Sequence, residues 1–396
     1  DLLPIGRRVA YWRGRRKLSQ QVLADRLGKS KSWVDKVERG VRSLDKVSTL
    51  RDIAAVLRID TAVLLGRDDR PADVAERVEG VERVRAALST YDIALGRSVA
   101  RCPALPADRL ARDVAHAWIT FQHARYPLVI ELVPDLLAGA QRTYAVDPVA
   151  GRVPLVGAYR VAASLLVKLG EAELGWLAAD RAMATATGDP VLVAAATVQL
   201  GQVLRASGRA RAALSAALAA AYRIAPPNSD GTRAAELSLC GTLLVQAALA
   251  AARDGDDRAT AELIDEAAGM ARRVGDGHDH HHTAFGPTAV DLARVAAAVE
   301  LGDANEAVAW HEKTTKRDAW RWLPAEHRAA HLLDAARAYL HTDDPTNAGR
   351  ALIEADRTAP AEVRQRPAAR SVLAQVARDP YAPATIIQLA AALGVT

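Results

Sequence analysis

Two lysines and a serine, Lys31, Ser32 and Lys36, lie close together in a short segment of the chain. An ammonium group can donate hydrogen bonds to O6 and N7 of guanine, and a hydroxyl group can donate or accept. On a helix these three residues, with Asp35, share one outer side because residues three or four apart are neighbours. The segment therefore predicts contacts with base edges in a DNA major groove.

A second set of donors flanks this segment on both sides. Hydroxyl, amide, guanidinium and ammonium groups beside a base-reading helix typically hold phosphates and set the register of the protein on DNA. We expect phosphate contacts from Gln20, Ser30, Arg42, Ser43 and Lys46.

Two short helices joined by a sharp turn must position these side chains. Helices are predicted over residues 20–27 and 31–39, with Ser19 and Ser30 as N-caps. Gly28 can take the left-handed conformation that ends the first helix, and Gly40 ends the second. Neither cap has a Glu or Gln three residues later, so the predicted boundaries are approximate. The residues expected to face inward are Val22, Leu23, Leu27, Val34 and Val37.

Residues 3–66 resemble the lambda Cro and repressor (XRE) family of helix-turn-helix regulators. The matching positions are Leu18-Ser19-Gln20, Leu23-Ala24, Gly28-x-Ser30, Val34, Val37 and Glu38-Arg39-Gly40. The resemblance implies a five-helix DNA-binding domain whose second turn helix reads bases. It also implies an ion pair between Arg13 and Glu38 that locks the first helix to the recognition helix. The alternative to the ion pair is two unrelated surface charges. The alternative to a DNA-binding domain is a helical interaction domain that has lost DNA binding.

The remaining helices of this head follow from apolar spacing. A first helix is predicted over residues 5–16, a fourth from Lys46, and a fifth closing on Leu64 and Leu65 before Gly66. Residues 1–70 contain 17 Lys and Arg against 9 Asp and Glu, a net charge of +8, although the whole chain carries only +5. A basic head on a slightly acidic remainder places the nucleic-acid surface in the head.

The 396-residue chain is long enough for several domains, and half of its residues are hydrophobic. Its two cysteines, Cys102 and Cys240, offer neither a disulfide framework nor zinc spacing. No signal peptide is evident. The longest apolar run, near residues 243–252, is interrupted by Gln246 and falls short of the ~20 residues that span a bilayer. We expect a cytoplasmic protein.

Beyond about residue 108 only helical periodicity is found. Helix pairs are expected to start near residues 108, 152, 190, 232, 284, 324 and 362, a spacing of about 40 residues that is typical of a solenoid. Two stretches resemble tetratricopeptide (TPR) repeats, with small residues where helices cross: Leu332-x-x-Ala335-Ala336-x-x-Tyr339 with Ala348, Leu352, Ala355 and Pro360, and Leu200-Gly201-x-x-Leu204 with Ala213, Ala217, Ala220 and Pro226. An irregular helical bundle is the alternative.

The predicted fold is therefore all-α: a five-helix Cro/repressor-like domain followed by a TPR-like helical-repeat solenoid. The expected domains are residues 1–68 for DNA binding, 69–107 for a linker with a connecting helix over 73–100, and 108–396 for sensing and dimerisation. The Thr283–Thr288 run and the repeat pattern of residues 323–360 resemble actinobacterial one-component regulators. More distantly, the layout is similar to peptide-sensing quorum regulators of firmicutes, in which the repeat body binds a peptide pheromone.

Aromatic and polar side chains cluster twice in a chain that has only 4% aromatic residues. Ligand pockets combine aromatic walls with a few polar groups, although ordinary solenoid core is an equally good explanation for any single Trp. The candidate pocket residues are Trp118, Gln122, Arg125, Tyr126, Phe285, Trp310, Trp320 and Trp322. Only three asparagines occur in the chain. This scarcity weakens the hypothesis of a peptide ligand, so a small-molecule ligand is comparably well supported.

The run His278–His282 is rich in imidazoles and is flanked by Asp276. Imidazoles and carboxylates can bind transition metals, and His280 and His282 are the weak candidates. A solvated turn is the better interpretation, because bunched neighbouring rings do not converge on one ion. We therefore expect no metal site.

No Ser/His/Asp set, carboxylate pair or cofactor loop stands out, so we expect no cofactor, no catalytic residues and no enzyme activity. The predicted function is a sequence-specific, homodimeric transcriptional regulator that reads an inverted repeat in double-stranded DNA and senses a small molecule or peptide through its body. The alternative is a protein-interaction scaffold in which DNA binding is secondary.

Overall fold

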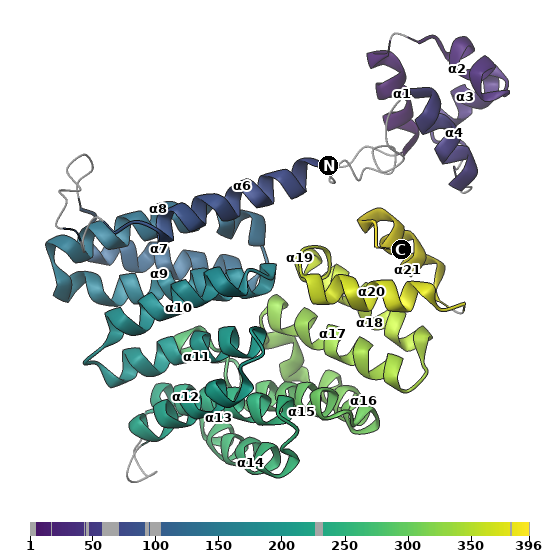
Figure 1. Ribbon diagram of the computed structural model, residues 1–396. Helices are drawn as coiled ribbons and strands as arrows, with labels where there is room; N and C mark the ends of the chain where they lie inside the picture. The colour runs from purple at the N-terminus through teal and green to yellow at the C-terminus, as the bar shows by residue number, and fades with distance from the viewer. Residues whose placement is uncertain are drawn as a thin grey trace. The chain divides into compact units, whose positions relative to one another are not determined.

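The computed structural model describes residues 5–16, 18–42, 44, 47–57, 71–91, 95, 104–225, 233–380 and 382–395. Within these ranges all regular structure is helical and there is no strand, which confirms the predicted all-α class (Figure 1). The chain forms two compact units, residues 1–79 and 80–396, called here the head and the body. The boundary falls inside one helix, α6 (Pro71–Leu88). The domain limits predicted at residues 68 and 107 remain predictions.

The described head contains α1 (Ile5–Arg15), α2 (Gln20–Leu27), α3 (Lys31–Glu38) and α4 (Val47–Leu57). The predicted fifth helix, with Leu64 and Leu65, lies outside the described residues. The helices enclose one small core: Val9, Leu23, Ala24, Val34, Ile53, Ala54 and Leu57.

Local capping explains why α2 and α3 begin and end where they do. The Ser19 hydroxyl accepts the backbone N–H of Val22 at 3.2 Å, and the Ser30 hydroxyl accepts that of Trp33 at 3.1 Å. Between them, Gly28 ends α2 with φ 62°, a conformation that glycine adopts without strain. The predicted inward position of Val22 is wrong: it is 38% exposed. Adjacent helix positions differ by about 100° around the axis, so Val22 turns outward where Leu23 turns inward.

The connecting helix is shorter than predicted, because α6 ends at Leu88 rather than near Ala100. Its second half belongs to the body, where Val81, Val84 and Leu88 are buried. Gly80 allows the close approach: a Cβ atom there would lie 2.2 Å from Cγ2 of Ile130. Val78 shares the helical spacing of Val81 and Val84, which predicts burial, but its side chain is 54% exposed.

The body consists of stacked antiparallel helix pairs, as the periodicity predicts (Figure 1). The pairs are α7 (Ala107–Gln122) and α8 (Tyr126–Val146), α9 (Pro148–Leu169) and α10 (Ala172–Ala186), α11 (Pro190–Ala206) and α12 (Ala210–Ile224), α13 (Ala234–Arg253) and α14 (Asp257–Val274), α15 (Pro287–Leu301) and α16 (Ala304–Thr315), and α17 (Ala325–His341) and α18 (Pro345–Thr358). The C-terminal helices are α19 (Pro360–Arg364), α20 (Pro367–Arg378) and α21 (Ala384–Leu393). Short 3₁₀ turns, η1 (His280–His282) and η2 (Asp318–Trp322), precede α15 and α17.

The first helix of each pair packs against the first helix of the next, so α7, α9, α11, α13, α15 and α17 form an inner layer. The small residues of the TPR-like pattern, such as Ala335, Ala348 and Ala355, are fully buried where helices cross. Two inner helices, α9 and α13, are long and apolar enough to span a membrane by composition alone. In each, 72% of the most apolar window is buried inside the body, so their apolarity is that of core helices.

The two ends of the body meet through a buried charge cluster. Lys168 of α9 forms an ion pair with Glu362 of α19 at 2.8 Å and a second pair with Glu326 of α17. The Tyr126 hydroxyl of α8 donates a hydrogen bond to the same Glu362. Because α17 and α19 follow the repeats that separate them from α8 and α9, these contacts close the stack of inner helices around a central space.

Candidate nucleic-acid interface and ligand cavity

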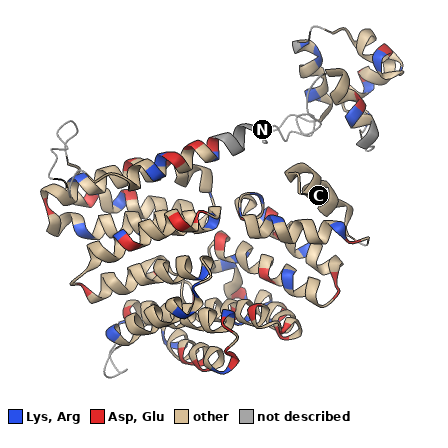
Figure 2. Cartoon of the chain, in the orientation of Figure 1, with Lys and Arg blue, Asp and Glu red and all other residues tan. Residues whose placement is uncertain are grey.

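Helix α3 divides into a buried face and an exposed face. Val34 and Val37 are buried in the head, whereas Lys31, Ser32 and Lys36 are exposed. The three predicted base-contacting side chains therefore share one open surface of the head, where their donors are available to a partner. In Figure 2 the Lys and Arg positions of this unit, coloured blue, are distributed along its helices.

Glu38 at the end of α3 fixes the helices against one another. Arg13 binds it in a bidentate ion pair, with Nε 2.6 Å from Oε1 and Nη2 3.0 Å from Oε2. The hydrogen bond to Glu38 raises the pKa of Arg13 above its usual value. Gln20 of α2 also donates to Oε2 of Glu38 at 2.8 Å. One Gln20 N–H is thus occupied, and a phosphate contact would use the other.

The remaining predicted phosphate contacts divide by position. Arg42 is exposed just beyond α3. Ser30 uses its oxygen as the N-cap acceptor, which leaves its O–H available as a donor. Ser43 and Lys46 lie outside the described residues.

Helices α1 and α3 of the head cross closely at Gly6, and the sequence indicated this crossing only by the presence of a glycine among the apolar residues of the first helix. A Cβ atom on Gly6 of α1 would lie 2.0 Å from the Val37 carbonyl oxygen of α3. Only glycine therefore lets α1 approach the recognition helix this closely.

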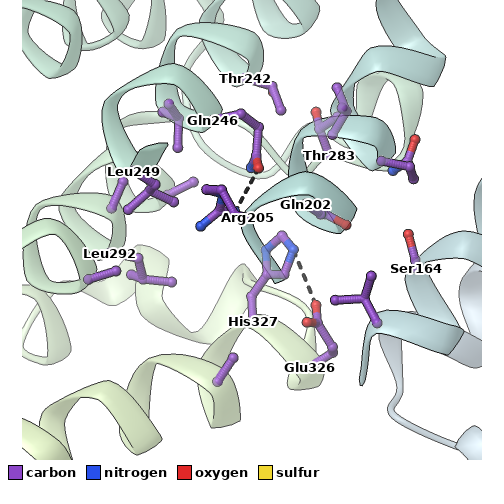
Figure 3. A pocket seen from close by; sticks show the side chains of 18 of the residues that line it. Ser164, Gln202, Arg205, Thr242, Gln246, Leu249, Thr283, Leu292, Glu326 and His327 are labelled. Atoms are coloured by element: carbon purple, nitrogen blue, oxygen red, sulfur yellow. Dashed lines mark hydrogen bonds and ion pairs between the residues drawn. The ribbon is translucent and has the colours of Figure 1, made fainter. Parts of the chain in front are cut away.

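The inner helices of the body surround a cavity of about 390 Å³ (Figure 3). Its wall has polar groups on α11 and α13, including Gln202, Arg205, Thr242 and Gln246, beside apolar groups such as Leu249. Nη2 of Arg205 donates to Oε1 of Gln246 at 2.8 Å. Burial lowers the pKa of Arg205 to about 10. Opposite these groups, Nε2 of His327 lies 3.3 Å from a Glu326 oxygen.

Sequence reasoning missed this polar wall because its members are far apart in the chain. One signal was available: Gln246 interrupts the apolar run of α13, and Thr242, Gln246, Leu249 and Arg253 recur at helical spacing on one face. As a polar stripe on one side of a helix, these residues indicate a face that does not pack entirely into the hydrophobic core.

The structure brings together only part of the predicted ligand pocket. Trp118 and Phe285 line the central cavity. Gln122 and Trp322 instead line a second cavity of about 370 Å³. There Gln122 donates to Asp279 at 2.9 Å, and Trp322 is 64% exposed.

The other four predicted pocket residues line neither cavity. Tyr126 is fully buried and bonded to Glu362. Trp320 is buried behind His331, with ring centroids 5.3 Å apart. Arg125 is exposed. Trp310 packs beside Lys313, whose Nζ lies 4.2 Å from the ring centroid. These residues are close in sequence to cavity residues, but their helical phase turns them to the core or to the surface.

The His-rich turn is held by its carboxylates. Asp276 accepts hydrogen bonds from the Thr288 backbone and hydroxyl, both at 2.9 Å. Although burial opposes it, hydrogen bonds from His282, Gln122 and the Ala284 backbone lower the pKa of Asp279 to about 2.

The two metal candidates point in different directions. The His282 ring stacks on Trp118 at 5.1 Å, and the His280 ring stacks on His278 at 5.6 Å. Among the described residues no group of three or more His, Cys, Asp or Glu side chains is placed to hold a metal ion.

Comparison with curated proteins gave no match. Among solved structures, BtubC (BKLC) from P. vanneervenii is 16% identical, with a TM-score of 0.39 over 63% of this chain and 90% of its own. PlcR from Bacillus thuringiensis, solved in complex with the peptide PapR7 and DNA, is 13% identical, with a TM-score of 0.37 over 91% of this chain and 99% of its own. TM-scores of this size do not establish a common fold.

The head alone matches a family. Residues 4–65 match the family described as a helix-turn-helix domain. These residues include all four described head helices and the exposed face of α3. The N-terminal unit of this chain is therefore a helix-turn-helix DNA-binding domain.

Proposed function

We propose that the protein is a sequence-specific transcriptional regulator. The observation that carries this proposal is the exposed face of α3, with Lys31, Ser32 and Lys36, in a helix-turn-helix domain. In such domains the second helix of the motif lies in the major groove. The net charge of +8 over residues 1–70 supplies attraction to phosphates.

Each predicted donor has a distinct role in this proposal. Lys31, Ser32 and Lys36 contact base edges, while Arg42 and Ser30, with Gln20, Ser43 and Lys46, contact phosphates. The Arg13–Glu38 pair keeps α3 at a fixed angle to α1, so that base contacts and phosphate contacts act in one register.

Selection of DNA from a random or genomic library tests this function. The full chain should enrich one sequence, and a gel shift should show much tighter binding to that sequence than to random DNA. The variant Lys31→Ala/Ser32→Ala/Lys36→Ala should lose the preference, whereas the control Arg51→Ala, at an exposed position of α4, should keep it. Absence of any enriched sequence would favour the alternative, a protein-interaction scaffold built on the helical body.

The body is proposed to act as a non-enzymatic ligand sensor. It offers a cavity of about 390 Å³, which is within the size range of small-molecule sites. A small molecule or a short peptide bound there would alter DNA affinity by favouring one arrangement of two heads over another. A tenfold change in DNA affinity requires a coupling free energy of only about 1.4 kcal/mol.

Dimerisation completes the proposal, because one small head covers too little DNA to be specific alone, roughly 600–1,000 Å². Two heads on a two-fold axis would read an inverted repeat with half-sites about one helical turn apart, or a multiple of it. The apolar stripes of residues 73–100 and 386–395 predict the dimer contacts, and these stretches overlap α6 and α21. In α21, however, Ile386 is buried within the body and Ile387 remains 49% exposed, so α21 offers a smaller apolar face than predicted. Sedimentation of the full chain tests dimerisation, and a monomer bound to a single half-site contradicts it.

A further inference from the structure

Three side chains on the wall of the central cavity carry buried polar atoms that have no hydrogen-bond partner among the described residues. They are Nε1 of Trp118, Nε of Arg205 and Nδ1 of His331. Trp118 is 2% exposed and His331 is 3% exposed. Buried polar atoms are nearly always hydrogen-bonded to protein or to water, so these three atoms offer hydrogen-bonding groups to whatever fills the cavity.

The charge of the wall indicates what that partner is. Cations outnumber carboxylates: the charged lining residues are Lys168, Arg205, Arg253, Arg366, Glu326 and Asp334. Lys168 is paired with Glu326 and Glu362, and Arg366 with Glu362 at 3.1 Å. Arg253 lies 4.0 Å from Glu300.

Arg205 is the exception on this wall. Its only hydrogen bond in the described structure is to a neutral amide, that of Gln246 at 2.8 Å. A guanidinium group remains charged at neutral pH even here, and it offers five N–H donors of which most are still free. Arg205 is half-buried, and Glu300 and Asp334 act on its charge without forming an ion pair with it. An anion that reaches the guanidinium would therefore gain charge-assisted hydrogen bonds that no carboxylate of the wall supplies.

Apolar side chains lie beside this cation. In Figure 3 Leu249 and Leu292 flank Arg205 and Gln246 on one side of the cavity. Phe285 also lines the cavity, with its ring packed against the backbone of Gly241. The wall thus combines one unpaired cation with an apolar surface.

We propose that the central cavity binds a small organic anion whose acid group pairs with Arg205 and whose apolar part packs against Leu249, Leu292 and Phe285. The N–H of Trp118 is a second donor on the same wall. This inference rests on the proposed function, since it names the chemical class of the effector that the body senses.

Two fluorescent probes that differ only in an acid group test the inference on the full-length protein. 8-Anilinonaphthalene-1-sulfonate carries a sulfonate, and N-phenyl-1-naphthylamine is the same molecule without it. The wild-type chain should bind the sulfonate more tightly. Arg205→Gln should weaken sulfonate binding about 10- to 100-fold and change binding of the neutral probe by less than about twofold, because only the charged hydrogen bond is lost.

Matched variants locate the effect. Arg223→Gln removes an exposed arginine from the last turn of α12, as Arg205 lies in the last turn of α11, and should leave both affinities unchanged. Ala296→Phe fills part of the cavity and should weaken both probes. Arg205→Lys keeps the charge and should retain part of the sulfonate affinity. If circular dichroism shows that Arg205→Gln has lost helical content, Arg205→Lys replaces it as the test of the anion site.

Several results would overturn the inference: no saturable sulfonate binding, equal binding of the two probes to the wild-type chain, sulfonate binding that survives Arg205→Gln, or insensitivity of both probes to Ala296→Phe. Its failure is separable from that of the proposed function. If the body binds only the neutral probe while the head still selects one DNA sequence, the proposed function stands and the anion site is contradicted. If sulfonate binding depends on Arg205 but the protein selects no DNA sequence, the anion site stands and the proposed function is contradicted.

Discussion

Lys31 is the side chain of α3 on which base reading most directly depends. It begins the helix and is exposed, so its ammonium can reach O6 and N7 of guanine. Lys31→Ala should cost on the order of 1–3 kcal/mol on the selected sequence and relax one base position. Binding titrations on selected and random DNA check this. Equal losses on both DNAs would make Lys31 a phosphate contact.

Arg42 is expected to act on the DNA backbone alone. It lies exposed beyond the end of α3, where a guanidinium meets phosphate rather than base edges. Arg42→Ala should weaken binding to all DNA sequences alike and lower the slope of log K against log salt by roughly one unit. Affinities measured over a salt series give the slope, and an unchanged slope removes Arg42 from the interface.

The crossing of α1 over α3 depends on a single missing Cβ atom. Because a Cβ on Gly6 would meet the Val37 carbonyl at 2.0 Å, Gly6→Ala must push the helices apart and should destabilise the head by about 1–3 kcal/mol. Gly14 lies on the same helix with nothing within 4 Å of its added Cβ. Gly14→Ala should therefore be neutral or stabilising by roughly 0.5–1 kcal/mol. Thermal unfolding of both variants distinguishes them, and similar behaviour would contradict the close crossing.

The packing of α16 on α17 contains two imidazoles in contact, with Nδ1 of His311 2.9 Å from Nε2 of His331. Burial, followed by the charge of His311, lowers the pKa of His331 to about 3. The unfolded chain binds this proton near its ordinary pKa of about 6.5, so unfolding takes up a proton below that pH. Stability is then greatest above pH ~6.5 and falls as the pH drops toward 3.

Replacing His331 by Phe should reduce this pH dependence. The loss of unfolding free energy between pH 7 and pH ~4.5 should shrink by up to about 2–3 kcal/mol. Denaturant unfolding at the two pH values measures it. His341→Phe, at the exposed end of the same helix, is the control. An equal reduction in both variants would show that the buried imidazole is not the source.

At the scale of the whole body, Glu362 joins the first and last repeats. It is fully buried and bonded to Lys168, Arg366 and Tyr126. Removing one partner of a buried ion pair typically costs about 3–5 kcal/mol, because the other charge stays buried and unpaired. Glu362→Gln should therefore lower the thermal stability of the body and speed hydrogen exchange in α19 and α20. Glu262→Gln breaks only an exposed pair with Arg258 and should cost under ~0.5 kcal/mol.

The sequence by itself determined the local elements and their order. Caps such as Ser19 and Ser30, the turn at Gly28 and the regular apolar spacing depend on neighbouring residues, so the head helices and the helix pairs could be predicted. The Arg13–Glu38 pair came from a family resemblance, since its members are too far apart for local rules. The end of α6 at Leu88 was not predicted by the apolar spacing alone.

Only the tertiary structure decided which side chains share the cavity. Tyr126 and Trp320 have the composition of pocket residues, but helix phase and packing bury them in the core. Arg205 and Gln246 meet because α11 and α13 are neighbours in the inner layer, a contact between residues 41 positions apart in the sequence. The closure through Lys168 and Glu362 depends likewise on small rotations added over successive helix pairs, which no local pattern encodes.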